Sequence, residues 1–134
     1  MRHATTGLML VALVTLPAHA QEDTAEGKML YRNYCATCHG LTGEGAGPMG
    51  PALILQPTDL TTLQRDNDDV FPLLRVVKRI DGRDPLVGHG SPMPVFGPFF
   101  EGGRDIALRT QAGQSILTSH PVAEIISWMR SIQK

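Results

Sequence analysis

The chain has 134 residues, with 12 Lys and Arg against 13 Asp and Glu, which gives a formal charge of −1. This length leaves room for one domain, and the balanced charge argues against a nucleic-acid binder. A hydrophobic fraction of 42% with 19% charged residues excludes a disordered tail, and two cysteines are too few for a disulfide-rich scaffold.

The first twenty residues have the features of a secretory signal. Arg2 precedes an apolar run over residues 8–16, and the small residues Ala18 and Ala20 have the spacing that signal peptidase requires. An uncleaved anchor is the alternative, but the run is shorter than the about 20 residues of a membrane span. We therefore expect export to the periplasm and no integral membrane segment in the mature protein. The predicted division is a cleaved signal peptide over residues 1–20 and one domain over residues 21–134.

The mature chain has helical patterns towards both ends and an irregular middle. Asp23 with Glu26 three residues later is typical of a helix start, and Pro121 is a favoured residue of a first helical turn. Repeated glycine and proline interrupt the middle of the chain. In chain order the patterns predict a helix over 25–36, a loop over 40–57, a helix within 70–80, a loop over 82–98, a short helix within 106–117 and a final helix from Pro121.

The chemistry is concentrated in Cys35-Ala36-Thr37-Cys38-His39. Two thiols three positions apart, with histidine next, form the attachment pattern of c-type haem. At the end of a helix, Cys35 and Cys38 project to one side, where each can form a thioether with one haem vinyl group. His39 follows at once and can turn its imidazole onto the iron. The pattern predicts one covalently bound haem c.

Three other interpretations of the two thiols stay open. A thioredoxin-like dithiol would need a βαβ setting, whereas these flanks are a helix and a Gly/Pro loop. A zinc site would need two more ligands, for which His89 and His120 are available. A disulfide between Cys35 and Cys38 would leave His39 unexplained.

The sequence around this motif resembles the class I monohaem cytochromes c. Gly27 and Tyr31 precede Cys35 where that family has a glycine and an aromatic residue, and Trp128 resembles the aromatic of its terminal helix. The resemblance implies an all-α fold, a small cytochrome c fold of three to five helices with long Gly/Pro-rich loops around one haem. It also implies that Gly27 allows the terminal helix to cross closely.

The resemblance implies two more site residues. Gly50-Pro51-Ala52-Leu53 resembles the family loop whose proline carbonyl accepts a hydrogen bond from the ligand histidine; Pro48 is the alternative to Pro51. Met93, held between Pro92 and Pro94, precedes the final helix as the family's ligand methionine does. His89 is the alternative ligand at that second iron position. Met93 can also be an ordinary residue of the hydrophobic core.

Iron held by His39 and Met93 has no open position for a substrate, so the implied function is electron transfer and not enzyme catalysis. The expected partners are redox proteins such as a dehydrogenase, an oxidase or a reductase, which a monomer or a loosely bound subunit would meet. The alternatives are a haem subunit of a dehydrogenase complex, and a haem enzyme or ligand sensor with an open distal site. Four basic residues lie in or just after the helix predicted within residues 70–80: Arg75, Lys78, Arg79 and Arg83. They can hold haem propionates, bind an acidic partner or form a solvated helix face.

Overall fold

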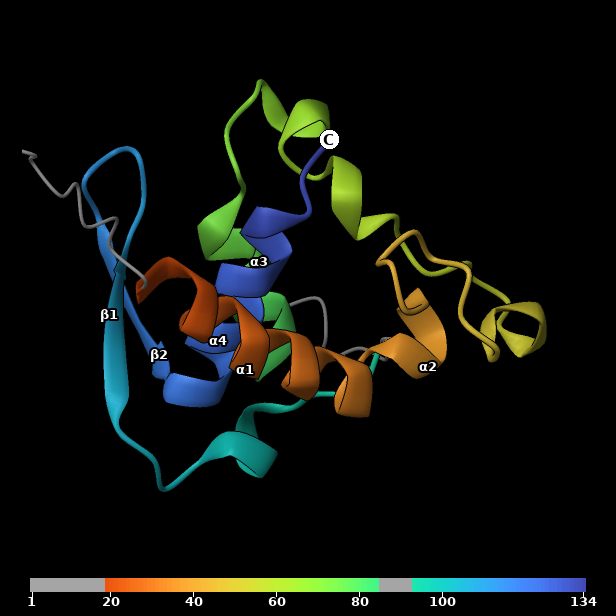
Figure 1. Cartoon of the computed structure of the whole chain (residues 1–134), viewed down its shortest axis with the longest axis horizontal. Coiled ribbons are helices and arrows are strands. Elements are labelled where there is room, and N and C mark those ends of the chain that lie inside the picture. Colours follow the sequence, from red (N-terminus) through yellow and green to blue (C-terminus); the bar gives the residue numbers. More distant parts are fainter. Residues whose placement is uncertain (1–18, 85–92) are drawn as a thin grey trace, which may run out of the picture.

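A computed structural model describes residues 19–84 and 93–134 of the chain. Two long helices cross at its centre, and shorter elements surround them (Figure 1). In the described residues, no helix is both long and apolar enough to cross a membrane. The helices and strands are α1 (His19–Tyr34), α2 (Ala36–His39), α3 (Leu73–Asp81), β1 (Asp105–Arg109), β2 (Ser115–Ser119) and α4 (His120–Ser131).

The crossing of α1 and α4 depends on Gly27. A β-carbon at this position would overlap the backbone carbonyl of Glu124 and would lie 3.0 Å from the β-carbon of Trp128. One turn further along α1, the Tyr31 ring packs on Trp128 with their centroids 4.0 Å apart. Glycine and the two aromatic rings therefore let the helices approach closely, as the resemblance implied.

Helix α3 closes the core behind this pair (Figure 1). Its inward side chains, including Val77 and Ile80, are buried against residues of α4, while Arg75 is exposed. This spacing is that of an amphipathic helix with one apolar stripe. The prediction of a helix within residues 70–80 is confirmed, with the helix running three residues later at its start and one at its end.

The predicted short helix within residues 106–117 is wrong, because this segment is an antiparallel hairpin of β1 and β2. Ile106 pairs with Thr118, and the side chains alternate between the outer face and the core. Gly113 has a φ of 80°, which permits the tight connection between the strands. The more buried residues of this segment alternate with exposed ones, and this alternation favours a strand over the predicted helix. The all-α class is therefore wrong in detail, although the helices dominate the described chain.

Helix α1 begins earlier than the sequence predicted, whereas α4 begins where it was expected. Asp23 lies inside α1 and not at its N-cap, since the helix already begins at His19. Nothing between His19 and Asp23 is a glycine or proline that would prevent this extension. Helix α4 begins at His120 with Pro121 in its first turn, as predicted. The proposed signal peptide falls almost wholly on residues 1–18, outside the described residues.

Candidate functional site

The two thiols lie where α1 passes into α2. Cys35 donates its backbone N–H to the Tyr31 carbonyl at 2.8 Å, and its own carbonyl accepts from the backbone N–H of His39 at 2.9 Å. Cys35 and Cys38 are both free and partly exposed. Cys35 as the N-cap of α2, with Cys38 and His39 inside it, thus places both thiols and the imidazole within about one helical turn.

The thiol of Cys35 is in an apolar setting. Its side chain packs against the main core, and burial raises its pKa to about 12, with a smaller contribution from Cys38. A thiol protonated at neutral pH is a poor metal ligand and a poor redox nucleophile. In the described residues, no cluster of three His, Cys, Asp or Glu side chains could hold a metal ion. The described residues therefore offer no support for the zinc or dithiol interpretation, and His89, one of the further zinc ligands considered, lies outside them.

The loop that follows His39 folds back along α2. The carbonyls of the last three residues of α2 would otherwise lack helical partners. Met49 N–H donates to Thr37 O at 3.0 Å, Gly47 N–H to Cys38 O at 3.1 Å, and Gly45 N–H to His39 O at 2.8 Å. The backbone of this Gly-rich loop therefore fixes the short helix from outside.

A buried tyrosine supports the same helix from inside. The Tyr31 hydroxyl donates to the Gly40 carbonyl at 2.7 Å, and its side chain is fully buried. Burial raises the pKa of Tyr31 above its usual range, with a further contribution from Cys35. This tyrosine therefore links the α1/α4 crossing to the residue that follows His39.

The imidazole of His39 faces a backbone carbonyl that the sequence did not predict. Its Nδ1 lies 3.1 Å from the carbonyl oxygen of Thr58, while Pro51 is exposed in the 3₁₀ turn Gly50–Ala52. The structure thus adds Thr58 as a candidate partner, and the role of the Pro51 or Pro48 carbonyl in the haem-bound protein stays a prediction. Partial burial lowers the pKa of His39, which the Thr58 bond partly opposes. A neutral ring that donates from Nδ1 keeps Nε2 free to bind a metal ion.

Met93 lies at the edge of the main core, partly buried. The chain after it is tied to α3, because Phe96 N–H donates to the Ile80 carbonyl at 2.8 Å. The other methionines of the described domain differ: Met129 is in the core, while Met29 and Met49 are exposed. His89, the alternative ligand, lies outside the described residues. The role of Met93 as a ligand stays a prediction.

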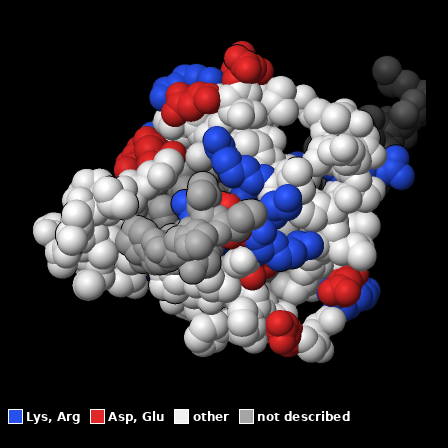
Figure 2. Space-filling model, turned by 180° about the vertical axis from the view of Figure 1, so that it is seen from behind, with Lys and Arg blue, Asp and Glu red and all other residues white. Residues whose placement is uncertain are grey.

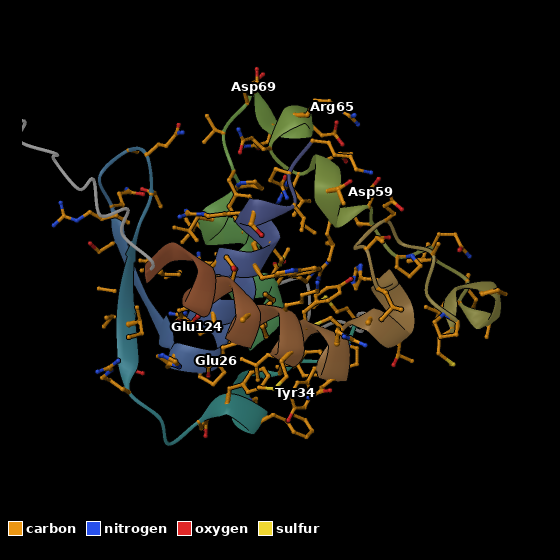
Figure 3. The ribbon with its side chains drawn as sticks, in the orientation of Figure 1. Glu26, Tyr34, Asp59, Arg65, Asp69 and Glu124 are labelled. Atoms are coloured by element: carbon orange, nitrogen blue, oxygen red, sulfur yellow. The ribbon has the colours of Figure 1, made fainter. Side chains whose placement is uncertain are left out.

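Aromatic rings gather beside this segment. Tyr34, at the end of α1, packs edge-on against Phe100 with centroids 5.1 Å apart and against Phe96 at 6.1 Å (Figure 3). These contacts join the end of the attachment helix to the chain that follows Met93. This cluster was not predicted from the sequence, because Tyr34 is far along the chain from Phe96 and Phe100.

Lys and Arg side chains gather on one face of the molecule (Figure 2). The four basic residues of the sequence cluster are Arg75, Lys78 and Arg79 of α3 and Arg83, which follows this helix. Two of the four are engaged locally: Arg79 pairs with Asp84 at 3.7 Å, and Arg83 donates to Asp81. Arg83 also donates to the Leu117 carbonyl at 2.7 Å and so fastens the hairpin to α3. At least part of this cluster is therefore structural.

The residues present fit a covalently attached haem. Two adjacent thiols can form thioethers, the His39 ring has its Nδ1 occupied and Nε2 available, and a methionine lies on the same core. The loop after His39 also exposes apolar side chains that suit a large apolar group: Leu41, Met49, Ile54 and Leu55.

The family model described as cytochrome c oxidase, cbb3-type, subunit III matches residues 22–105. The match covers Cys35, Cys38, His39 and Met93, and it ends where the hairpin begins. Neither the curated proteins nor the solved structures include a match to this chain.

Proposed function

Since the chain belongs to the c-type cytochrome family described as cytochrome c oxidase, cbb3-type, subunit III, we propose that it is a periplasmic carrier of single electrons. The observation that carries this proposal is the placement of Cys38 and His39 on the short helix α2 with Cys35 as its N-cap, and the contact of His39 Nδ1 with a carbonyl. Haem c supplies reversible one-electron chemistry when it is bound.

The chain's own residues have separate roles in this proposal. Cys35 and Cys38 attach the cofactor, each thiol adding its S–H across one vinyl group so that a C–S bond forms. His39 would hold the iron through Nε2, and Met93 would hold it through its thioether sulfur. A haem held by both side chains would supply one-electron exchange and leave no ligand position for a substrate, so the protein would be a carrier and not an enzyme.

A second candidate function is that of a haem subunit within a larger oxidoreductase complex. The description of the matching family, which names an oxidase subunit, favours this candidate. Its partner would then be permanent, whereas a free carrier meets a donor and an acceptor in turn. A haem enzyme or ligand sensor requires that Met93 leave the second axial position open.

The decisive experiment is expression with the c-type maturation machinery, followed by intact-mass analysis of the secreted protein. We expect a chain that begins at Gln21 and carries one haem. Replacing both cysteines with alanine should abolish attachment, and either single replacement should weaken it. Thr37→Ala, between the cysteines, is the matched control and should retain the haem. Haem that acidified organic solvent extracts from the wild-type chain would contradict the proposal.

The same mass spectrum tests the export signal. Cleavage after Ala20 removes the apolar run and shortens α1 by two residues, to begin at Gln21. A mass that retains residues 1–20 would instead support an anchored protein. Size-exclusion chromatography of the native periplasmic extract separates the two candidate functions. A free carrier elutes at its own size, and a subunit elutes with a complex.

A further inference from the structure

The turn after Pro57 presents the carbonyl that faces His39. The Thr58 oxygen lies 3.1 Å from Nδ1, and this bond accounts for one ring nitrogen. A histidine that donates from Nδ1 is held in the tautomer whose Nε2 binds a metal ion, and the bond raises the basicity of that nitrogen. The orientation of one peptide group therefore decides the state of the ring.

Asp59 caps the turn that follows Thr58. Its Oδ1 accepts from the backbone N–H of Thr61 at 2.8 Å and from the Thr61 hydroxyl at 2.6 Å. These two bonds form the N-cap of the 3₁₀ turn Leu60–Thr62. Thr61 is itself buried, so the turn that Asp59 caps has a fixed base on the core.

Two further contacts hold the turn from opposite sides. Leu60 N–H donates to the Gly43 carbonyl at 2.7 Å, which ties the turn to the loop after His39. The backbone N–H of Lys134 donates to the Thr61 carbonyl at 2.8 Å, which ties it to the chain end beyond α4. Figure 3 shows Asp59 at this junction, between the loop after α2 and the turn that follows it.

Resting on the proposed function, we propose that Asp59 is a positioning residue for the axial imidazole. It orients the Thr58 carbonyl, which holds the proton on His39 Nδ1 and strengthens Nε2 as a donor. A stronger donor favours Fe(III), so the intact turn lowers the reduction potential of the haem. The carboxylate acts through its geometry as an acceptor, and its negative charge is not required for this role.

The test compares Asp59→Asn with Asp59→Ala in the mature, haem-loaded protein. Both variants remove the same charge, but asparagine keeps an oxygen that can accept from Thr61. We expect the alanine variant to have the higher reduction potential of the two. Because both variants lose the same charge, a difference between their reduction potentials reports the effect of the hydrogen bonds alone.

Asp66 supplies a matched control pair. Its Oδ2 accepts from the Thr62 hydroxyl at 2.7 Å, so it makes the same kind of bond at the far end of the same turn. Asp66→Asn and Asp66→Ala should have equal reduction potentials. If the Asp59 pair is also equal, or if the Asp66 pair differs as much as the Asp59 pair, the positioning role is overturned.

A measurement on the wild-type protein keeps the proposal falsifiable if Asp59→Ala does not fold. In the reduced, diamagnetic protein, the His39 Nδ1–H proton should show nuclear Overhauser effects to Thr58 and Asp59. Effects to Pro51 and Ala52 instead would overturn the assignment. Failure of the proposed function looks different, because the wild-type chain would then carry no covalent haem at all.

Discussion

The Glu124 carbonyl of α4 passes so close to Gly27 of α1 that no side chain fits between them. The contact sets the separation of the two central helices, on which the Tyr31–Trp128 stacking depends. Since Tyr31 in turn holds the carbonyl after His39, the crossing of the helices and the geometry of the candidate haem site are coupled.

Gly27→Ala should destabilise the protein, although alanine has the higher helix propensity. Overpacking of a tight contact costs about 1–3 kcal/mol, which exceeds the gain of about 1 kcal/mol from propensity. Chemical denaturation of the haem-loaded protein measures the free energy of unfolding. Gly103→Ala is the control, because a β-carbon there meets nothing within 4 Å. Equal stability of the two variants would show that α1 and α4 do not cross as described.

Tyr31→Phe should lower the free energy of unfolding by about 1 kcal/mol, because the Gly40 carbonyl loses a buried hydrogen bond while the ring stacking remains. Tyr34→Phe is the matched control, since the Tyr34 side chain is 43% exposed and packs through its ring. Denaturation curves of the two variants give the comparison. A larger loss from the Tyr34 variant would contradict the buried role of Tyr31.

In the haem-free chain, the Cys35 thiol should react slowly with an alkylating reagent at neutral pH. Burial, the main cause, raises the pKa of this thiol to about 12, so the thiolate is a small fraction at neutral pH and grows tenfold with each pH unit. Alkylation of a Cys38→Ser variant, followed by mass spectrometry, should accelerate steadily above pH 8. A rate that levels off near pH 9 would show that Cys35 is solvent-exposed in the chain without haem.

The parts of the fold that follow from local spacing were predictable. Gly27, Tyr31 and the Cys35–His39 motif lie within one helix and its end, so their spacing already determines which of them share a face. The hairpin was not predictable in the same way, because the short apolar pattern around Ile106 and Ile116 is compatible with either helix or strand.

The carbonyl beside His39 was not predictable for a different reason. Every residue carries a backbone carbonyl, so residue type alone does not reveal which carbonyl will face His39. The motif around Pro51 suggested one candidate, whereas the Thr58 carbonyl lies 3.1 Å from Nδ1 in the structure. The sequence signal that was missed is Asp59 with Thr61 two residues later, which is typical of a capped turn.

The second axial ligand gives the remaining prediction. Met93→Ala should abolish the weak near-infrared charge-transfer band of thioether-bound ferric haem, lower the reduction potential and open the iron to cyanide. The physical reason is that the soft sulfur donor favours Fe(II), and its loss leaves the sixth position free. Met49→Ala, in the exposed loop, and Met129→Ala, in the core, should keep the band.

Substitution separates Met93 from its rival His89. Because His39 is an imidazole ligand with either candidate, loss of the low-spin spectrum in acid does not tell them apart, whereas removal of the second ligand does. We therefore expect His89→Ala to keep the low-spin spectrum and Met93→Ala to lose it. If Met93→Ala retains that spectrum while His89→Ala becomes high-spin, then Met93 is a packing residue at the core edge and His89 is the ligand.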